Sequence, residues 1–198
     1  MHQMSYGYIK DYTGIYIMKR GGGKQKGSSF ERYTAKFLTR WLTGKDRPYA
    51  FYRQPASGGI FTIFEECGDM SGDIRAMLPI AIPMMQKISV ECKNGYPHTN
   101  FHQHLKHTKG FQIKKFWIQC LSDATKSSKY PMLIFKKQGL NAIVGIDCKL
   151  RTILKKQIKL PESITLRFDD LTSVTFYDMI EFFSIVTPEI IEDLPCQG

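Results

Sequence analysis

The sequence has no apolar run near the roughly 20 residues that a membrane-spanning helix needs. Its longest run, residues 76–85, contains two prolines. Cysteine is also scarce, with five residues and no C-x-x-C pair, which argues against both a disulfide framework and a zinc knuckle. The N-terminus lacks the apolar core and the cleavage site of a secretory signal peptide. These absences predict a reduced, intracellular protein of the cytoplasm that does not contact a membrane.

Acidic residues are few, with 18 against 28 lysines and arginines, and the formal net charge is +10. The excess is uneven, because residues 18–60 and residues 93–137 each carry a net +8, whereas residues 160–198 carry −7. Two basic segments beside an acidic one predict an electropositive face that binds a polyanion such as DNA. A chance gradient over an ordinary solvated surface is the alternative.

Hydrophobic residues make up 42% of the 198 residues, enough for one packed domain. Their spacing and the turn residues predict helices at 29–43, 111–127 and 176–185, and strands at 49–53, 72–77, 87–94, 130–135, 142–146 and 164–168. The proline-containing apolar run is predicted to be a loop. This order of elements predicts an α/β fold with a central mixed β-sheet flanked by helices.

One predicted strand carries a candidate catalytic pattern. In residues 87–94 the side chains alternate, so Glu91 and Lys93 lie on one face and the apolar side chains on the other. Asp73 opens the preceding short strand. Carboxylates from separate strands suit Mg²⁺, and a neighbouring lysine can orient or deprotonate a water, or neutralise charge on a phosphate. A structural ion pair on a half-exposed strand is the alternative for Glu91 and Lys93.

An acid-x-Lys pattern occurs twice, about as often as chance predicts. The first instance, residues 91–93, follows Asp73 by eighteen residues. The second, residues 147–149, has no acid nearer upstream than Asp123, which lies in a predicted helix. Context therefore favours the first instance as the functional one.

Four motifs in a fixed order carry a family resemblance. Lys-Gly-Ser-Ser-Phe-Glu-Arg at residues 26–32 begins the first predicted helix, and Pro-Ala-Ser-Gly-Gly at 55–59 follows the first predicted strand. Gly-Asp-Ile at 72–74 and Val-Glu-Cys-Lys at 90–93 come next. Together they resemble the archaeal-type Holliday junction resolvases, a branch of the PD-(D/E)XK nuclease superfamily, over residues 25–137.

The resemblance implies a restriction-endonuclease-like core. We therefore divide the chain into a basic flexible N-terminal extension (residues 1–27), a PD-(D/E)XK nuclease core (28–147) and an acidic C-terminal extension packed on the core (148–198). The resemblance also implies a homodimer that makes paired nicks in four-way DNA junctions. Its implied cofactor is Mg²⁺, with Mn²⁺ as a substitute.

Matched position by position, the motifs imply a role for each polar residue. The implied metal ligands are Asp73, Glu91 and the backbone carbonyl of Cys92. The implied catalytic side chains are Lys93 for the attacking water, Glu31 for the metal or the water, and Ser57 for the scissile phosphate. Within the motifs, Gly72 departs from the proline that is usual in the family.

Three features have alternative interpretations. Asp69 is a rival of Asp73 for the metal. Glu31, three residues after Ser28, also fits a capping box that would only close a helix terminus. Four histidines within residues 98–107 resemble zinc ligands, but no carboxylate or thiol lies close enough to complete a site, which favours a polar or DNA-facing surface.

Basic side chains near these motifs and near the end of the second long helix are candidates for contacts with DNA phosphates. They are Lys24, Lys26, Arg32, Arg53, Lys126 and Lys129. The sequence thus predicts a Mg²⁺-dependent endodeoxyribonuclease that resolves four-way junctions. A nuclease of the same fold acting on duplex or flapped DNA, in restriction or repair, and a non-catalytic DNA-binding module are the alternatives.

Overall fold

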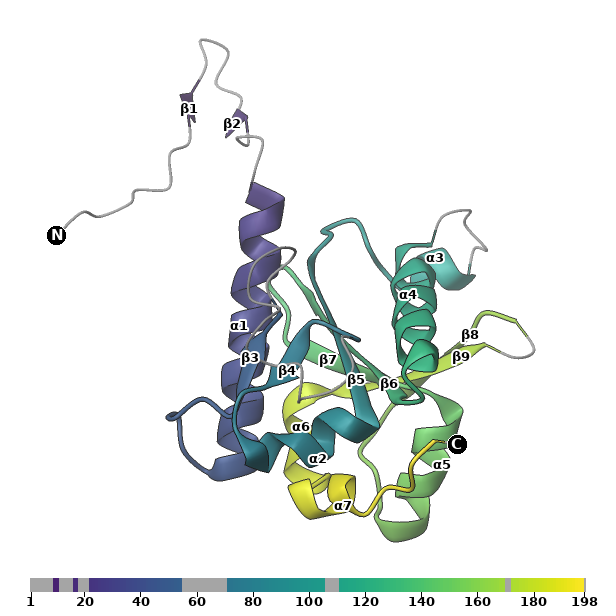
Figure 1. Ribbon diagram of the computed structural model, residues 1–198. Helices are drawn as coiled ribbons and strands as arrows, with labels where there is room; N and C mark the ends of the chain where they lie inside the picture. The colour runs from purple at the N-terminus through teal and green to yellow at the C-terminus, as the bar shows by residue number, and fades with distance from the viewer. Residues whose placement is uncertain are drawn as a thin grey trace, which may run out of the picture.

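A five-stranded sheet forms the centre of the computed structural model (Figure 1). Its strands lie in the order β5 (Ile88–Gly95), β6 (Tyr130–Lys137), β7 (Ala142–Ile146), β9 (Ser173–Asp178) and β8 (Ile164–Arg167). The structure describes residues 9–10, 16–17, 22–54, 71–105, 111–169 and 172–197, without the side chains before residue 27 and that of residue 103.

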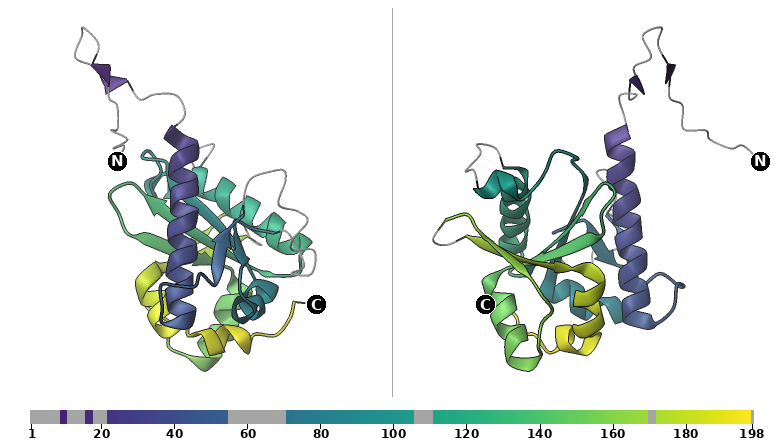
Figure 2. Two further views of the ribbon diagram at one scale, coloured as in Figure 1. Left: turned by 60° about the vertical axis from the view of Figure 1, so that its left-hand side comes forward. Right: turned by 180° about the vertical axis from the view of Figure 1, so that it is seen from behind.

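The sheet is mixed, as predicted. Strands β5 and β6 are parallel, with helix α4 (Gln112–Lys126) between them in the chain, and the other neighbouring strands are antiparallel. Figure 2 shows α1 (Gly22–Thr43) on one side of the sheet and α4 on the other. The α/β class with helices flanking a mixed sheet is therefore confirmed.

Side-chain alternation along the strands divides the core into two clusters. On β6, Met132 packs in a cluster with α1 and α6 (Met179–Ile185), whereas Leu133 packs in a second cluster with α4. On β5, Val90 belongs to the first cluster. Glu91 therefore points to the sheet face that α4 covers.

A second, two-stranded sheet joins the first at the β5 edge. It consists of the antiparallel strands β3 (Phe51–Arg53) and β4 (Ile74–Ala76). The backbone N–H of Asp73 donates to the carbonyl of Val90, 2.7 Å away. Gly72 permits this approach, because its φ is +83° and a Cβ would lie 2.6 Å from the Val90 oxygen. A proline, with φ fixed near −65°, cannot replace this glycine.

Helix α1 begins earlier than predicted, at Gly22 rather than near residue 29. Residues 22–27, predicted to be part of a flexible extension, are therefore helical, since adding turns to a formed helix is cheap once packing has nucleated it. Ser28 consequently lies inside the helix and cannot cap its start. The capping-box interpretation of Glu31 is wrong.

The proline-containing run is helical instead of a loop. It forms a short 3₁₀ helix (Pro79–Ala81) followed by α2 (Ile82–Lys87). Each proline lies within the first two positions of its helix, where the missing N–H has no intrahelical acceptor to lose. The prediction of a loop failed because prolines mark helix starts as well as helix breaks.

The acidic C-terminal part contributes to the central sheet and to its core. Helix α5 (Cys148–Gln157), which the sequence did not predict, precedes β8 and β9, and α7 (Pro188–Glu192) follows α6. The helix predicted over 176–185 is wrong in its first residues, because they belong to β9 and pair with β7. A short buried apolar run has no periodicity that separates strand from helix.

The remaining described elements are small. Strands β1 (Ile9–Lys10) and β2 (Tyr16–Ile17) form an antiparallel pair, and α3 (His102–Leu105) precedes α4. Over the ranges that the structure describes, no helix has the length and apolar character needed to cross a bilayer.

Candidate active site

Asp73 lies where the two sheets meet, one residue before β4. Its Oδ2 accepts a hydrogen bond of 2.8 Å from the backbone N–H of Cys92. Its backbone N–H donates to Val90, and its carbonyl accepts from the N–H of Gln54, 2.7 Å away. Asp73 is therefore tied to β5 on both sides of Glu91.

Glu91 and Lys93 form an ion pair on β5, with 2.5 Å between Oε1 and Nζ. Glu91 is 4% exposed. The Lys93 ammonium also lies 5.8 Å from the centre of the Phe116 ring on α4. The predicted placement of both side chains on one face is confirmed, although the strand is buried here instead of half-exposed. A buried ion pair adds little net stability, so a purely structural role explains it poorly.

Burial and neighbouring charges shift the pKa values of Glu91, Asp73 and Lys93, and these influences act in opposite directions. Burial, with the nearby charge of Asp73, raises the pKa of Glu91 to about 7 against the effect of Lys93. Burial also raises the pKa of Asp73, against the Cys92 N–H and Lys93. Burial by itself lowers the pKa of Lys93, but the hydrogen bond and charge of Glu91 raise it overall. Side chains whose pKa values are shifted both by burial and by a specific charged neighbour are typical of functional sites.

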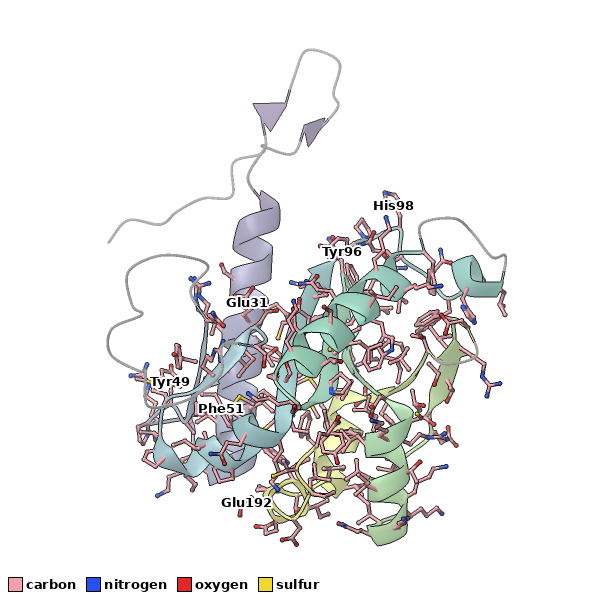
Figure 3. The ribbon with its side chains drawn as sticks, turned by 45° about the vertical axis from the view of Figure 1, so that its right-hand side comes forward. Glu31, Tyr49, Phe51, Tyr96, His98 and Glu192 are labelled. Carbon is pink, nitrogen blue, oxygen red and sulfur yellow. The ribbon has the colours of Figure 1, made fainter. Side chains whose placement is uncertain are left out.

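Glu31, on α1 (labelled in Figure 3), is a further charged neighbour of Asp73. Its Oε2 lies 3.3 Å from Nη1 of Arg53 on β3. Burial and the charge of Asp73 raise the pKa of Glu31, and Arg53 opposes this rise. The structure thus brings Glu31 within electrostatic range of Asp73. Arg53, predicted to contact DNA, pairs with Glu31 and keeps 30% of its side chain exposed.

The donor chemistry of this site suits a hard divalent cation. Asp73 and Glu91 supply carboxylate oxygens, and a cation beside them would lower the pKa values that their repulsion and burial raise. In the part of the chain that the structure describes, no three His, Cys, Asp or Glu side chains are gathered into a metal-binding group. A cation here would need the two carboxylates together with backbone carbonyl or water oxygens, as is usual for Mg²⁺.

Asp123 on α4 is a charged neighbour of the site that sequence reasoning missed. Its charge raises the pKa of both Asp73 and Glu91. Its carboxylate also lies 3.1 Å from the ammonium of Lys126. The sequence carries no signal for this position, because Asp123 reaches the site only through the packing of α4 on β5 and β6.

Besides Arg53, three of the residues predicted to contact DNA have described side chains. Arg32 is exposed on α1, and Lys126 is exposed beside Asp123. Lys129 is only 7% exposed. The prediction that Lys129 contacts DNA is therefore wrong, because a buried side chain does not reach a phosphate on the surface.

Several predicted residues fall outside what the structure describes. The backbones of Lys24 and Lys26 lie in the first two turns of α1, without described side chains. Ser57 and the rival ligand Asp69 lie outside the described residues altogether. Their predicted roles stay predictions.

The second acid-x-Lys pattern has a structural role. Asp147 is the N-cap of α5, and its Oδ1 accepts a 2.8 Å hydrogen bond from the N–H of Leu150. This capping role agrees with the preference for residues 91–93 as the functional instance of the pattern.

One of the four histidines that resemble zinc ligands, His104, packs its ring against Phe111 and Phe168 at the edge of the core.

Comparison with known families adds one finding. The family model described as "Phage putative PDDEXK endonuclease" matches residues 22–192. The match begins with the first residue of α1 and ends with the last residue of α7, so it includes both β3–β4 and the whole central sheet. No curated protein and no solved structure matches the chain.

Proposed function

The chain belongs to the family of phage PDDEXK endonucleases, and from this premise we propose that it is a metal-dependent, structure-selective DNA endonuclease. Membership confirms the PD-(D/E)XK superfamily and the restriction-endonuclease-like fold expected from the motifs. The archaeal-type resolvase branch, the four-way junction as substrate and the homodimer belong to the proposal.

The hydrogen bond from Cys92 to Asp73 carries the proposal. It places one carboxylate against the strand that presents Glu91 and Lys93. Two carboxylates and a lysine from neighbouring strands can hold a cation and a phosphodiester side by side. The structural alternative needs the buried Glu91 and the half-buried Asp73 and Lys93 to be charged with no function, which is costly.

Lys93 acts in this proposal as a cation instead of a base. Glu91 raises the pKa of Lys93, which keeps the ammonium protonated at neutral pH. A fixed positive charge beside the carboxylates would stabilise negative charge on the phosphate and orient the attacking water. Of the roles expected for this lysine, proton abstraction is the one that the electrostatics favour least.

The proposed ligands of Mg²⁺, or of Mn²⁺, are Asp73, Glu91 and the backbone carbonyl of Cys92. When bound, such a cation supplies Lewis-acid polarisation of the phosphate and lowers the pKa of a coordinated water. Glu31 is proposed to assist from α1, where Arg53 holds its carboxylate. Ser57 is proposed to act at the phosphate.

Four-way junctions are the proposed substrate because the ordered motifs resemble those of junction resolvases. The net +10 charge supports backbone binding without base readout. A homodimer is proposed because two symmetric nicks need two active sites.

A cleavage assay tests the proposal. A synthetic four-way junction and a linear duplex of the same sequence are incubated with Mg²⁺ or with chelator, using the wild type and Asp73→Asn. Symmetric nicking of only the junction, with Mg²⁺ and the wild type alone, is the expected result. Equal cleavage of the duplex would favour a restriction or repair nuclease, and binding without cleavage in Mg²⁺ or Mn²⁺ would favour a non-catalytic module.

A further inference from the structure

Tyr96, in the loop that follows β5, exposes an aromatic ring close to the site. The residue is 44% exposed. One side of its ring packs edge-to-face on Phe116, with 4.6 Å between the ring centres and 63° between the planes. The Lys93 ammonium lies 5.8 Å from the centre of the same Phe116 ring. Tyr96 and Lys93 therefore both lie against the ring of Phe116.

The backbone holds Tyr96 in an unusual conformation. Its φ is +52°, in the left-handed region that bulky residues rarely adopt. The preceding Gly95 also has a positive φ, +100°. The Tyr96 carbonyl accepts a 3.0 Å hydrogen bond from the N–H of Thr99, which is buried. Backbone strain that the surroundings maintain is concentrated at functional sites.

The end of the sheet at which Tyr96 lies has further features of a nucleic-acid surface. In the β5–β6 register, Asn94 lies opposite Lys136. The Lys136 ammonium lies 5.6 Å from the ring centre of Tyr33, which is 49% exposed on α1. By the side-chain alternation of β6, this second cation–ring pair lies on the α1 face of the sheet, whereas Lys93 and Tyr96 lie on the α4 face. Both faces therefore carry a cation beside an exposed ring at the carboxyl ends of β5 and β6, the combination that binds phosphates and nucleobases together.

We propose that Tyr96 stacks on a nucleobase that has lost its neighbour at a branch point of the DNA, next to the phosphate that Lys93 contacts. This inference rests on the proposed nuclease function. In a nucleotide the sugar joins the phosphate to the base. A nucleotide whose phosphate lies beside Lys93 can therefore bring its base to the ring of Tyr96. In a continuous duplex both faces of each base are covered, so the tyrosine gains a partner only where stacking is interrupted.

The closing experiment compares binding in chelator, where no cleavage occurs, to a four-way junction and to a linear duplex of the same sequence. Tyr96→Ala is expected to weaken junction binding by about five- to a hundredfold and duplex binding by less than twofold. Tyr96→Phe keeps the ring and is expected to bind both as the wild type does. Tyr49→Ala is the matched control, because Tyr49 is also exposed, at 38%, but lies well away from Tyr96 (Figure 3).

A second readout is independent of how well the variants fold. A junction with 5-iododeoxyuridine at the branch point is irradiated with the wild-type protein, and the crosslinked peptide is mapped. A crosslink at Tyr96 supports the proposal. Junction preference unchanged in Tyr96→Ala, or a crosslink elsewhere, would overturn it while the nuclease function stands. A wild type without any junction preference would overturn the proposed substrate as well.

Discussion

The ammonium of Lys93 and the carboxylate of Glu91 lie 2.5 Å apart on β5, with only 17% and 5% of their side chains exposed. Asp73 adds a second carboxylate to the same place through its hydrogen bond to Cys92. Burial and repulsion oppose ionisation of the two carboxylates. Keeping both carboxylates ionised therefore has an electrostatic cost that the proposed divalent cation would relieve, and this cost can be measured.

The pH dependence of stability reports on Glu91. Its pKa in the folded protein is about 7, above the ordinary 4.5, so the folded state holds this proton more tightly than the unfolded state. The resulting stabilisation is complete below pH 4.5 and is lost as the pH rises through 7. From pH 4.5 to 8, in chelator, the wild type is expected to lose about 2–3 kcal/mol of unfolding free energy relative to Glu91→Gln. Urea unfolding measures this, and parallel pH curves would contradict it.

Asp73→Asn is expected to reduce cleavage by about two to three orders of magnitude and to leave DNA binding intact. The asparagine oxygen can still accept the Cys92 N–H, so the melting temperature should stay near that of the wild type. Asp193→Asn, at an exposed position after α7, is the matched control. Full activity of Asp73→Asn would refute the assignment.

Glu31→Gln separates a role in the site from a role in the helix. Because α1 begins at Gly22, Glu31 caps nothing, and its loss should change the unfolding free energy by no more than about 1 kcal/mol, as for a partly exposed ion pair. Cleavage should fall by about tenfold or more. Glu192→Gln, exposed at the end of α7, is the control for both measurements (Figure 3). A loss of helix stability without loss of cleavage would argue for a structural role.

The charge on Arg32 is expected to contribute to backbone binding. Arg32→Ala should weaken DNA affinity similarly for all sequences and reduce the salt slope of the binding constant by about one unit. Arg40→Ala is the matched control, because Arg40 is exposed on the same helix but lies in its last turn. Binding isotherms at several salt concentrations compare the two variants. Equal salt slopes for Arg32→Ala and Arg40→Ala would show that Arg32 does not contact the DNA backbone.

Leu194 tests whether the C-terminal residues belong to the core. It is 1% exposed, and its carbonyl accepts a hydrogen bond from the Lys87 ammonium. Leu194→Ala should cost about 2–4 kcal/mol of unfolding free energy. Leu140→Ala, at a position 60% exposed, should cost almost nothing. A small effect of Leu194→Ala in chemical unfolding would mean that this segment is only loosely attached.

The central strands could be predicted from the sequence because their signals are local. The alternation in β5 placed Glu91 and Lys93 on one face, and the structure confirms it. The motif order predicted that Glu31 and Asp73 would approach this strand. Burial could not be predicted, since the half-exposed pattern of β5 gave no sign that α4 covers Glu91.

Other features depended on tertiary contacts. The glycines before residue 28 disfavour a helix, but packing of Phe30 and Leu38 nucleates α1 and the helix extends back through them. Residues 173–178 are a strand because β7 and β8 flank them, which local periodicity does not reveal. Asp123 became part of the site only through the packing of α4 on β5 and β6.

Diffraction from crystals soaked in Mn²⁺, recorded at the manganese absorption edge, tests the central claim most directly. The account predicts an anomalous peak within about 2.2 Å of carboxylate oxygens of both Asp73 and Glu91, absent in Asp73→Asn crystals. Manganese bound elsewhere, or no peak at this place while the soaked protein still cleaves DNA, would contradict it.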